Sequence, residues 1–197
     1  MHKVEDIFYS LMGEGQFIGV PTVFIVLGEE KKMSVNDIIK KVQTFPIKML
    51  CLTGESQDCE DLISKLTNMG YKCLIQTDGI QDVRPYQEFP DTRISMDVKT
   101  PSSNTPDVDK CSKTDWNNLS ALRFNDEVSF VIDDIKDYDF AKNVLSMYKP
   151  ICNVFFKPKG GINGKKLSKW LLRDKLPDVR LGIQLHKLLC GKYQKSV

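Results

Sequence analysis

The sequence predicts an α/β fold in which parallel strands alternate with helices. Three observations support it: apolar runs of strand length recur along the chain, amphipathic segments of about three turns separate them, and glycines and polar residues follow most of these runs. Successive parallel strands need a crossover of this kind, so we expect an α/β sheet or barrel. At 197 residues the chain is expected to form a single domain, residues 1–197.

The expected elements follow from apolar periodicity and from local start and stop signals. Ser34 is suited to cap the first helix, because its hydroxyl oxygen can accept a hydrogen bond from a backbone N–H of the first turn. Gly70 ends the second helix, since glycine readily adopts the left-handed conformation found after helices. In order, we expect strand 23–27, helix 33–45, strand 47–53, helix 58–70, strand 71–77, strand 93–98, helix 114–123, strand 127–133, helix 138–148, strand 151–156, helix 165–174 and strand 179–185.

The residues after the strands are the candidates for a ligand site. In both open sheets and barrels of this class, ligands bind at the carboxyl ends of the parallel strands. The segments expected there are VLG, TGES, QTDG, DVKTPSS, FKPKGG and QLHK. Near the amino terminus, the turn Gly13-Glu14-Gly15 could bring main-chain N–H groups close to a ligand, although an ordinary loop before a strand explains it equally well.

Composition excludes several classes of protein. No apolar run is long enough to span a bilayer and no signal-peptide core is present, so we expect a cytoplasmic protein without membrane contact. The net charge is +2, yet residues 157–197 hold far more Lys and Arg than Asp and Glu. This basic end could bind nucleic acid or phosphate, but a solvated helix face is favoured because no aromatic residues are interleaved with it.

The six cysteines are scattered, with no two closer than eight positions. This spacing fits neither a zinc ribbon nor a local iron-sulfur motif. We expect the cysteines to be small buried side chains in a reducing compartment rather than a disulfide framework.

In their order along the chain, a series of short motifs resembles 7-carboxy-7-deazaguanine synthase, a radical S-adenosylmethionine enzyme. The motifs are FYSLMGEG, LTGE, IQTDG, MDVKTPSS, FVID, DYDFAKNVL, FFKPKGG and RLGIQLHK. The resemblance covers nearly the whole chain. It implies an incomplete parallel (β/α) barrel of the radical S-adenosylmethionine type and a homodimer.

The resemblance also implies a reaction and its cofactors. The family converts 6-carboxy-5,6,7,8-tetrahydropterin into 7-carboxy-7-deazaguanine, a precursor of the deazapurines queuosine and archaeosine. It uses a [4Fe-4S] cluster, S-adenosyl-L-methionine and Mg2+. A CxxxCxxC loop holds the cluster in the family, because three thiolates must converge on one face of the cube.

Site residues can be carried over only where the motifs match. The family's substrate contacts fall on Leu11, Met12, Gly13 and Thr53. Its cofactor contacts fall on Gly54, Glu55, Gln76, Asp78, Asp97, Val98, Lys99, Lys157 and Pro158. No metal ligand and no catalytic residue can be assigned in this chain.

The chain departs from the family at the places where its chemistry occurs. No cysteine follows the strand 23–27, and the CxxxCxxC loop is absent. Met12 stands where the family has glutamine, and Val26 where it has a substrate-binding arginine, so an amide and a carboxylate clamp are lost. Gln76 and Asp78 replace the commoner glutamate and asparagine, and residues 55–57 depart from the family's TGGEP motif.

Three interpretations of these departures remain open. Two loops of the natural protein could be missing from this sequence with their flanks joined, in which case Val26 is not a replaced arginine. Alternatively, the chain is a catalytically dead relative that keeps its barrel to bind a pterin or a protein. The third interpretation, a structural or RNA-associated α/β protein, rests only on the basic carboxyl-terminal end. As written, the chain lacks the cluster loop and is expected to be inactive.

Overall fold

The computed structural model describes residues 1–54, 58–103, 113–159 and 162–189. Its strands form one eight-stranded sheet in the order β1-β2-β3-β4-β5-β6-β7-β8. They are β1 (His2–Leu11), β2 (Pro21–Met33), β3 (Met49–Gly54), β4 (Lys72–Thr77), β5 (Thr92–Val98), β6 (Glu127–Ile132), β7 (Asn153–Pro158) and β8 (Val179–Leu181). Each pair from β2 to β8 is parallel, whereas β1 runs antiparallel to β2.

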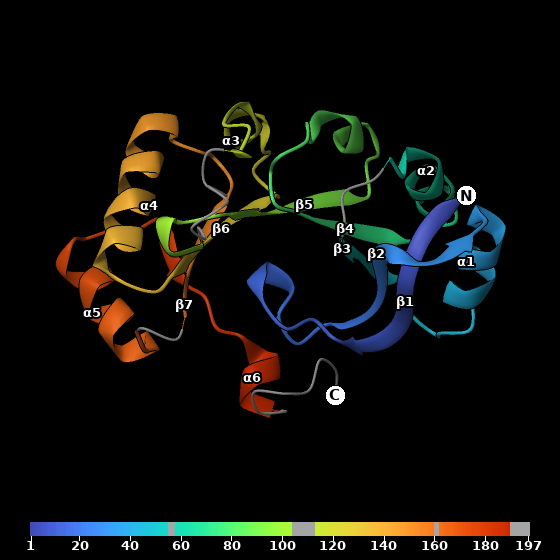
Figure 1. Cartoon of the computed structure of the whole chain (residues 1–197), viewed down its shortest axis with the longest axis horizontal. Helices are drawn as coiled ribbons and strands as arrows, with labels where there is room; N and C mark the ends of the chain where they lie inside the picture. Colours follow the sequence, from blue (N-terminus) through green and yellow to red (C-terminus); the bar gives the residue numbers. More distant parts are fainter. Residues whose placement is uncertain (55–57, 104–112, 160–161, 190–197) are drawn as a thin grey trace.

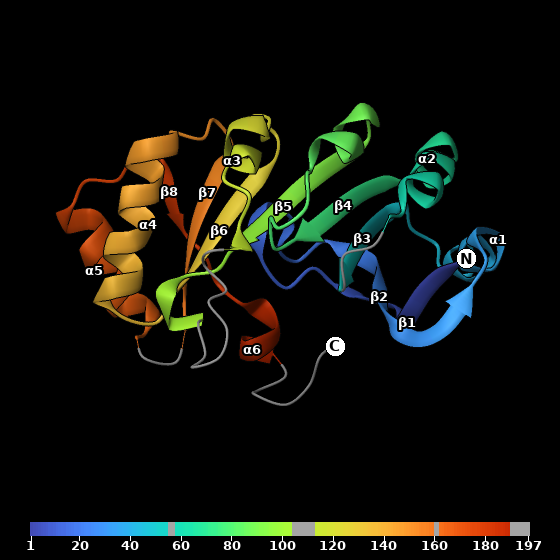
Figure 2. The same ribbon diagram turned by 45° about the horizontal axis from the view of Figure 1, so that its top comes forward.

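All α-helices but α6 (Leu185–Leu189) lie along the outer side of this sheet, among the described residues (Figure 1). The helices are α1 (Val35–Val42), α2 (Glu60–Asn68), α3 (Asn117–Ala121), α4 (Ile135–Tyr148), α5 (Gly164–Arg173) and α6 (Leu185–Leu189), with short 3-10 helices η1 (Gly15–Phe17), η2 (Arg84–Glu88) and η3 (Pro101–Ser103). Figure 1 shows the sheet as an arc with α1 to α5 outside it and α6 on its inner side. Figure 2 shows the strands side by side in chain order. Because no pairing joins β8 to β1 within the described residues, the barrel is incomplete, which confirms the predicted fold class.

Alternation along the strands separates two faces. In β3, Leu50 and Leu52 pack into the large core between sheet and helices, while Cys51 faces the inner side. On that inner side Cys51 forms a small apolar cluster with Met12 and Leu74. The period of two in a strand produces this division, so the neighbouring positions of each strand are free to carry polar groups toward the inside of the barrel.

Helix capping follows the sequence closely. The Ser34 side chain accepts a hydrogen bond from the Asp37 N–H at 3.2 Å, which confirms the predicted cap of α1. Gly70 follows α2 with a φ of +76°, in the left-handed conformation expected there. Asp134 accepts hydrogen bonds from two N–H groups of the first turn of α4. That cap makes α4 begin at Ile135, three residues before the predicted start.

Several elements differ from the prediction. The strand β1 was not anticipated, because its exposed positions carry charge and its pairing with β2 depends on residues 10 to 31 positions away. The predicted strand 179–185 is shorter: Gly182 N–H donates to the Phe156 carbonyl at 2.8 Å just after β8, and α6 then begins at Leu185. No helix among the described residues is long and apolar enough to cross a bilayer.

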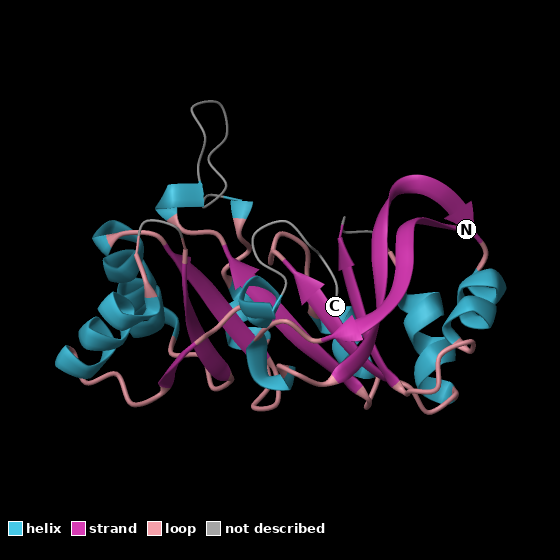
Figure 3. Ribbon diagram, turned by 90° about the horizontal axis from the view of Figure 1, so that it is seen from below, coloured by secondary structure: helices cyan, strands magenta, loops and turns pink. Residues whose placement is uncertain are grey.

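The two N-terminal strands form an arm that extends past the rest of the sheet, as Figure 3 shows near the N-terminus. β3 pairs with β2 only over Val23–Leu27, so the remainder of β2 is paired with β1 alone. The register slips within this arm, because Leu27 and Lys31 both lie opposite Val4. Residues 28–30, just after the predicted strand 23–27, therefore have no opposite residues in the β1 ladder and form a bulge, although the Glu29 side chain pairs with Lys3 of β1.

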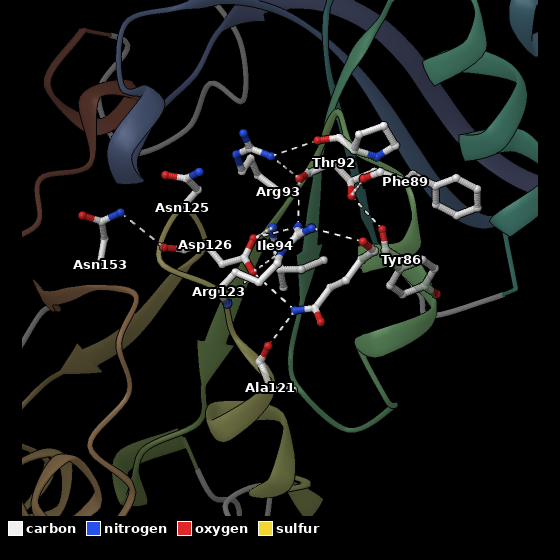
Figure 4. Close-up of polar contacts among 12 residues, drawn as sticks. Tyr86, Phe89, Thr92, Arg93, Ile94, Ala121, Arg123, Asn125, Asp126 and Asn153 are labelled. Carbon is white, nitrogen blue, oxygen red and sulfur yellow. Dashed lines mark hydrogen bonds and ion pairs between the residues drawn. The ribbon is translucent and has the colours of Figure 1, made fainter.

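A polar network ties together the amino ends of β5 and β6 (Figure 4). Asp126 is fully buried and accepts hydrogen bonds from the Ile94 N–H at 2.9 Å and the Arg123 N–H at 2.8 Å. The Arg123 guanidinium lies 3.1 Å from the same carboxylate and also donates to the Thr92 carbonyl. At this end of the sheet, the buried donors and acceptors therefore hydrogen-bond to one another.

Candidate functional site

A cavity of about 760 Å³ opens at the carboxyl ends of the strands. Its walls come from strands β1 to β5 and β7, from η2, from the residue before α2 and from the turn before η1. This is the position that the sequence predicts for a ligand site. Its volume lies within the roughly 300 to 1,000 Å³ range of small-molecule sites.

Many of the sequence-predicted site residues meet in this cavity although they come from four strands and their following loops. Those that line it are Thr53, Gly54, Gln76, Asp78, Asp97, Lys99 and Lys157. The carboxyl ends of parallel strands lie at one edge of the sheet, which is why residues as far apart in sequence as Thr53 and Lys157 line the same cavity. Their assignment to substrate or cofactor contacts remains a prediction.

Other predicted residues lie away from the cavity wall. Val98 is fully buried in the core on the helix side of the sheet, so its side chain is not offered to a ligand. Pro158 ends β7 opposite Ile132. Glu55 lies outside the described residues.

The predicted substrate turn at residues 11–13 is closed by its own hydrogen bonds. Leu11 pairs with Pro21 at the end of β1. Met12 is buried against the inner apolar cluster; its N–H donates to the Val20 carbonyl at 2.9 Å and its carbonyl accepts from Gly19 at 2.8 Å. The Gly13 carbonyl accepts from the Leu185 N–H at 2.7 Å. A ligand would therefore meet the residue that follows this turn rather than Met12.

That following residue, Glu14, lines the cavity and was not among the predicted site residues. Its carboxylate lies 3.1 Å from the Lys157 Nζ. Gln184 also donates to it at 3.4 Å, from the far end of the chain. The two flanking glycines were the only sequence signal that could have pointed to it.

Lys157 is the centre of the charges in the cavity. Its side chain is only 3% exposed, and its ammonium group lies 3.7 Å from Asp97 as well as beside Glu14. Asp97 in turn accepts a hydrogen bond from the Ser129 hydroxyl at 2.8 Å and one from Lys99 at 3.1 Å. A buried lysine needs such partners, because an unpaired ammonium in the interior is strongly unfavourable.

A second buried carboxylate, Glu127, lies on the inner side of the sheet. It is 2% exposed and accepts hydrogen bonds from the Ser95 hydroxyl and from the Gln16 N–H, both at 2.7 Å. Burial raises the pKa of Glu127 above its ordinary value, although these donors and the Lys157 charge act in the opposite direction. In the sequence, Glu127 is marked only as the first residue of the predicted strand 127–133.

Two buried side chains fix the loops at the rim of the cavity. The Asn118 amide group donates to the Gly79 and Gln81 carbonyls at 3.0 and 2.8 Å and accepts from the Val83 N–H, so α3 holds the loop after β4. Asp137 accepts from the Ser102 N–H at 2.9 Å and holds the loop after β5 against α4. Asp78 and Lys99 are thus carried on anchored loops.

The described cysteines do not fit a [4Fe-4S] cluster. Cys51, Cys59, Cys73 and Cys152 are buried and belong to different segments of the chain, and burial raises the pKa of each thiol, to about 12 for the last three. A cluster requires thiolates that converge from a short segment. Among the residues that the structure describes, no group of three or more His, Cys, Asp or Glu side chains could hold a metal ion.

The sequence is similar along its whole length to proteins named 7-carboxy-7-deazaguanine synthase. It is 29% identical to the one from Koribacter versatilis, with 99% of this chain and 100% of the relative covered. Identity is 28% with the Methanospirillum hungatei protein, with 95% and 85% covered, and 26% with the Thermoplasma acidophilum protein, with 95% and 97% covered. No family model matches the chain.

The fold is that of a solved structure, the crystal structure of QueE from Escherichia coli. The two share a TM-score of 0.72 over 94% of each chain, with 19% sequence identity. The match to the Koribacter protein extends over 234 residues although this chain has 197, so the relative carries residues without a counterpart here. The chain is thus similar over nearly its whole length to proteins named 7-carboxy-7-deazaguanine synthase, and it contains no CxxxCxxC segment of the kind that this resemblance implies.

Proposed function

We propose that this protein belongs to the step of deazapurine biosynthesis that forms 7-carboxy-7-deazaguanine, and that its cavity binds 6-carboxy-5,6,7,8-tetrahydropterin. The observation that carries the proposal is whole-length similarity to synthases of this product, combined with a cavity lined by residues at the matching positions.

The groups around the cavity suit a flat, polar heterocycle that carries a carboxylate. The Thr53 hydroxyl, the Gln76 amide and the Asp97 carboxylate offer donors and acceptors for the ring edges. Lys99 and Lys157 are the two cations of the lining, and a ligand carboxylate would share them with their partners Asp97 and Glu14. A site that hydrogen-bonds such edges discriminates strongly against analogues without them, because its own polar groups would then be left unpaired.

The family's conversion of this substrate depends on cofactors that the described residues do not accommodate. Radical chemistry with S-adenosyl-L-methionine needs the [4Fe-4S] cluster, and the described residues include no group of three or more His, Cys, Asp or Glu side chains that could hold a metal ion. We therefore assign no chemical step to this chain beyond binding and orienting the pterin. A homodimer, as the family implies, belongs to the same proposal.

The second candidate is a catalytically dead pterin-binding relative, and the bulge at residues 28–30 is compatible with both candidates. After the bulge at residues 28–30, Lys31 to Met33 pair again with β1, so the ribbon closes over the place of the missing loop. The chain folds there without a cluster segment. If loops of the natural protein are missing from this sequence, the bulge marks the point from which one of them would extend.

Binding and cluster formation separate these functions. We expect the 22.5 kDa chain to bind 6-carboxypterin in calorimetry, and to form no stoichiometric cluster on anaerobic addition of iron and sulfide. No binding would refute the pterin site. A broad charge-transfer absorbance with about four irons per chain would refute the assignment of a cluster-free protein.

An insertion variant distinguishes the synthase from the dead relative. A CxxxCxxC segment placed between Gly28 and Glu29 should bind iron, whereas the same segment with serines should not. Conversion of the tetrahydropterin by the cysteine variant, with S-adenosyl-L-methionine and Mg2+, would favour the synthase. Cluster formation without conversion would favour the dead relative, and an intact mass of the natural protein above 22.5 kDa would favour missing loops.

A further inference from the structure

Glu127 lies beneath the cavity rather than in its wall. It is the first residue of β6, it is 2% exposed, and the cavity is lined by its hydrogen-bond partner Ser95 and by nearby charged residues but not by Glu127 itself. Any effect of this carboxylate on a ligand must therefore pass through other residues. The contacts of Glu127 show which ones.

One oxygen of Glu127 holds the N-terminal turn. The Gln16 N–H donates to Oε2 at 2.7 Å across 111 positions of sequence. Gly15, with a φ of +73°, lies so close that a Cβ on it would be 2.2 Å from Oε1. The turn thus fits against the carboxylate only with glycine at this position.

The carboxylate is itself held from the other side. The Ser95 hydroxyl donates to Oε1 at 2.7 Å, so both oxygens have partners. The Gln16 side chain adds a bond from its amide nitrogen to the Asn125 carbonyl at 3.0 Å, just before β6. The 3-10 helix η1 is therefore fixed to the amino end of β6 by main-chain and side-chain bonds.

Through this turn Glu127 reaches the cavity. Glu14 precedes Gly15 directly, and its carboxylate pairs with Lys157, which also lies 3.7 Å from Asp97. If the turn no longer bonded to Glu127, Glu14 would move away from Lys157. Of the two carboxylates that now contact the buried Lys157 ammonium, only Asp97 would then remain beside it. Loss of one partner of a buried charge is costly, so the cavity would rearrange.

We propose that Glu127 is a positioning residue for the ligand cavity: by holding Gly15 and Gln16 it fixes Glu14 beside Lys157, and this arrangement sets the orientation of the bound pterin. The inference rests on the proposed function, because it concerns the ligand assigned there. The charged and titratable groups around Glu127, among the described residues, include Glu14, Lys157 and the thiols of Cys51 and Cys152.

Three variants test this role. Glu127→Leu removes both acceptors. Glu127→Gln keeps an amide oxygen for the Gln16 N–H, and its amide N–H can donate to the Ser95 oxygen. Asp126→Asn is the matched control, because Asp126 is a neighbouring buried carboxylate whose contacts are with Ile94, Arg123 and Gln87 rather than with η1.

We expect Glu127→Leu to weaken 6-carboxypterin binding by about tenfold or more, with Glu127→Gln within about threefold of the parent. Asp126→Asn should lower thermal stability but leave the affinity of the folded protein unchanged. Equal affinity of the folded Leu variant and the parent would overturn the proposal, as would a Gln variant as weak as Leu. Should Glu127→Leu not fold, Gly15→Ala displaces the same turn, and parent-like affinity in that variant would overturn the proposal equally.

A measurement without ligand separates this inference from the proposed function. Amide hydrogen exchange over residues 13–17 should accelerate in Glu127→Leu but not in Glu127→Gln or Asp126→Asn. Unchanged exchange in the Leu variant would overturn the positioning role. If the parent protein does not bind 6-carboxypterin, the proposed function fails, and accelerated exchange would still show that Glu127 holds the turn.

Discussion

The two ends of β5 and β6 use similar polar residues in opposite ways. At the amino end, Asp126 is fully buried and lies in the network drawn in Figure 4. At the carboxyl end of β5, Asp97 and Lys99 have side chains that are 35% and 34% exposed and face the cavity. Both ends contain a carboxylate beside a cation, yet only one of them retains access to a ligand.

The difference shows which of these polar groups stabilise the fold and which stay available to a ligand. Asp126 receives main-chain N–H groups from Ile94 and Arg123 together with a guanidinium, so its acceptor capacity is filled by the protein. Asp97 receives the Ser129 hydroxyl and two lysines but no main-chain N–H among the described bonds. Side chains can exchange partners when a ligand enters, whereas main-chain donors in a sheet cannot move without disturbing it.

The largest expected effect is at the amino end. Asp126→Ala leaves the Ile94 N–H unpaired and removes the carboxylate next to the partly buried Arg123. We expect the free energy of unfolding to fall by about 3 to 5 kcal/mol, the usual cost of breaking a buried ion pair. Urea unfolding measures it. A loss below about 1 kcal/mol would mean that the network contributes little to stability.

Gly54, at the carboxyl end of β3, should give the next largest effect. Its φ is +106°, and a Cβ there would lie 2.0 Å from the Leu27 carbonyl oxygen of β2. We expect Gly54→Ala to lower the free energy of unfolding by about 2 kcal/mol or more, because strain and overlap add.

Gly19→Ala provides the control for that prediction. Gly19 has a φ of +80° but open space where its Cβ would be, so this variant reports the conformational cost alone. We expect it to cost about 1 kcal/mol. Equal losses of stability in the two variants would show that the close approach of β3 to β2 adds nothing to the cost, and that the cavity rim can accommodate an added Cβ.

The parallel part of the fold could be predicted from sequence because its signals are local. Apolar runs marked β3 to β7, Ser34 marked the start of α1, and Gly70 marked the end of α2. The strand ends also placed Thr53, Gln76 and Asp97 together without further information, because parallel strands share one carboxyl edge.

What could not be predicted depends on pairing between distant segments. β1 is stabilised by its antiparallel partner β2, and its own charged alternation gave no clear strand signal. Met12 turned out to be buried because Cys51 and Leu74 meet it on the inner face. Glu127 accepts a hydrogen bond from the Gln16 N–H, and nothing near either residue in the sequence indicates that contact.

At the carboxyl end, Thr53 provides a smaller and more selective effect. If its hydroxyl pairs with a buried group of the pterin, Thr53→Val should weaken 6-carboxypterin binding by about 1 to 3 kcal/mol with little change in fold. Thr53→Ser keeps the hydroxyl and should bind nearly as the parent does. Calorimetry on the folded variants decides: equal affinity of the Val and Ser proteins would remove Thr53 from the site.

The smallest effect is a change in how stability depends on pH, and it sharpens the contrast between Glu127 and exposed carboxylates. Burial raises the pKa of Glu127 above its ordinary value of 4.5. The folded protein then holds this proton more tightly than the unfolded chain, so the stability that the protonated carboxyl contributes is complete below pH 4.5 and is lost as pH rises through the folded pKa. The glutamine in Glu127→Gln cannot ionise. The free energy of unfolding of this variant should therefore increase relative to that of the parent as pH rises.

Glu29 supplies the opposite sign. Its hydrogen bond with Lys3 lowers the pKa of this exposed carboxyl, so the corresponding contribution is present above pH 4.5 and is lost as pH falls. The free energy of unfolding of Glu29→Gln should therefore decrease relative to that of the parent as pH rises. The change should be smaller than for Glu127 because solvent screens the ion pair. Urea unfolding of the three proteins between about pH 4 and pH 8 measures both trends. Other titrating groups are common to the parent and the variants, so they largely cancel in each difference. A pH-independent difference between Glu127→Gln and the parent would show that Glu127 titrates as an exposed carboxylate does, which would contradict its burial beneath η1.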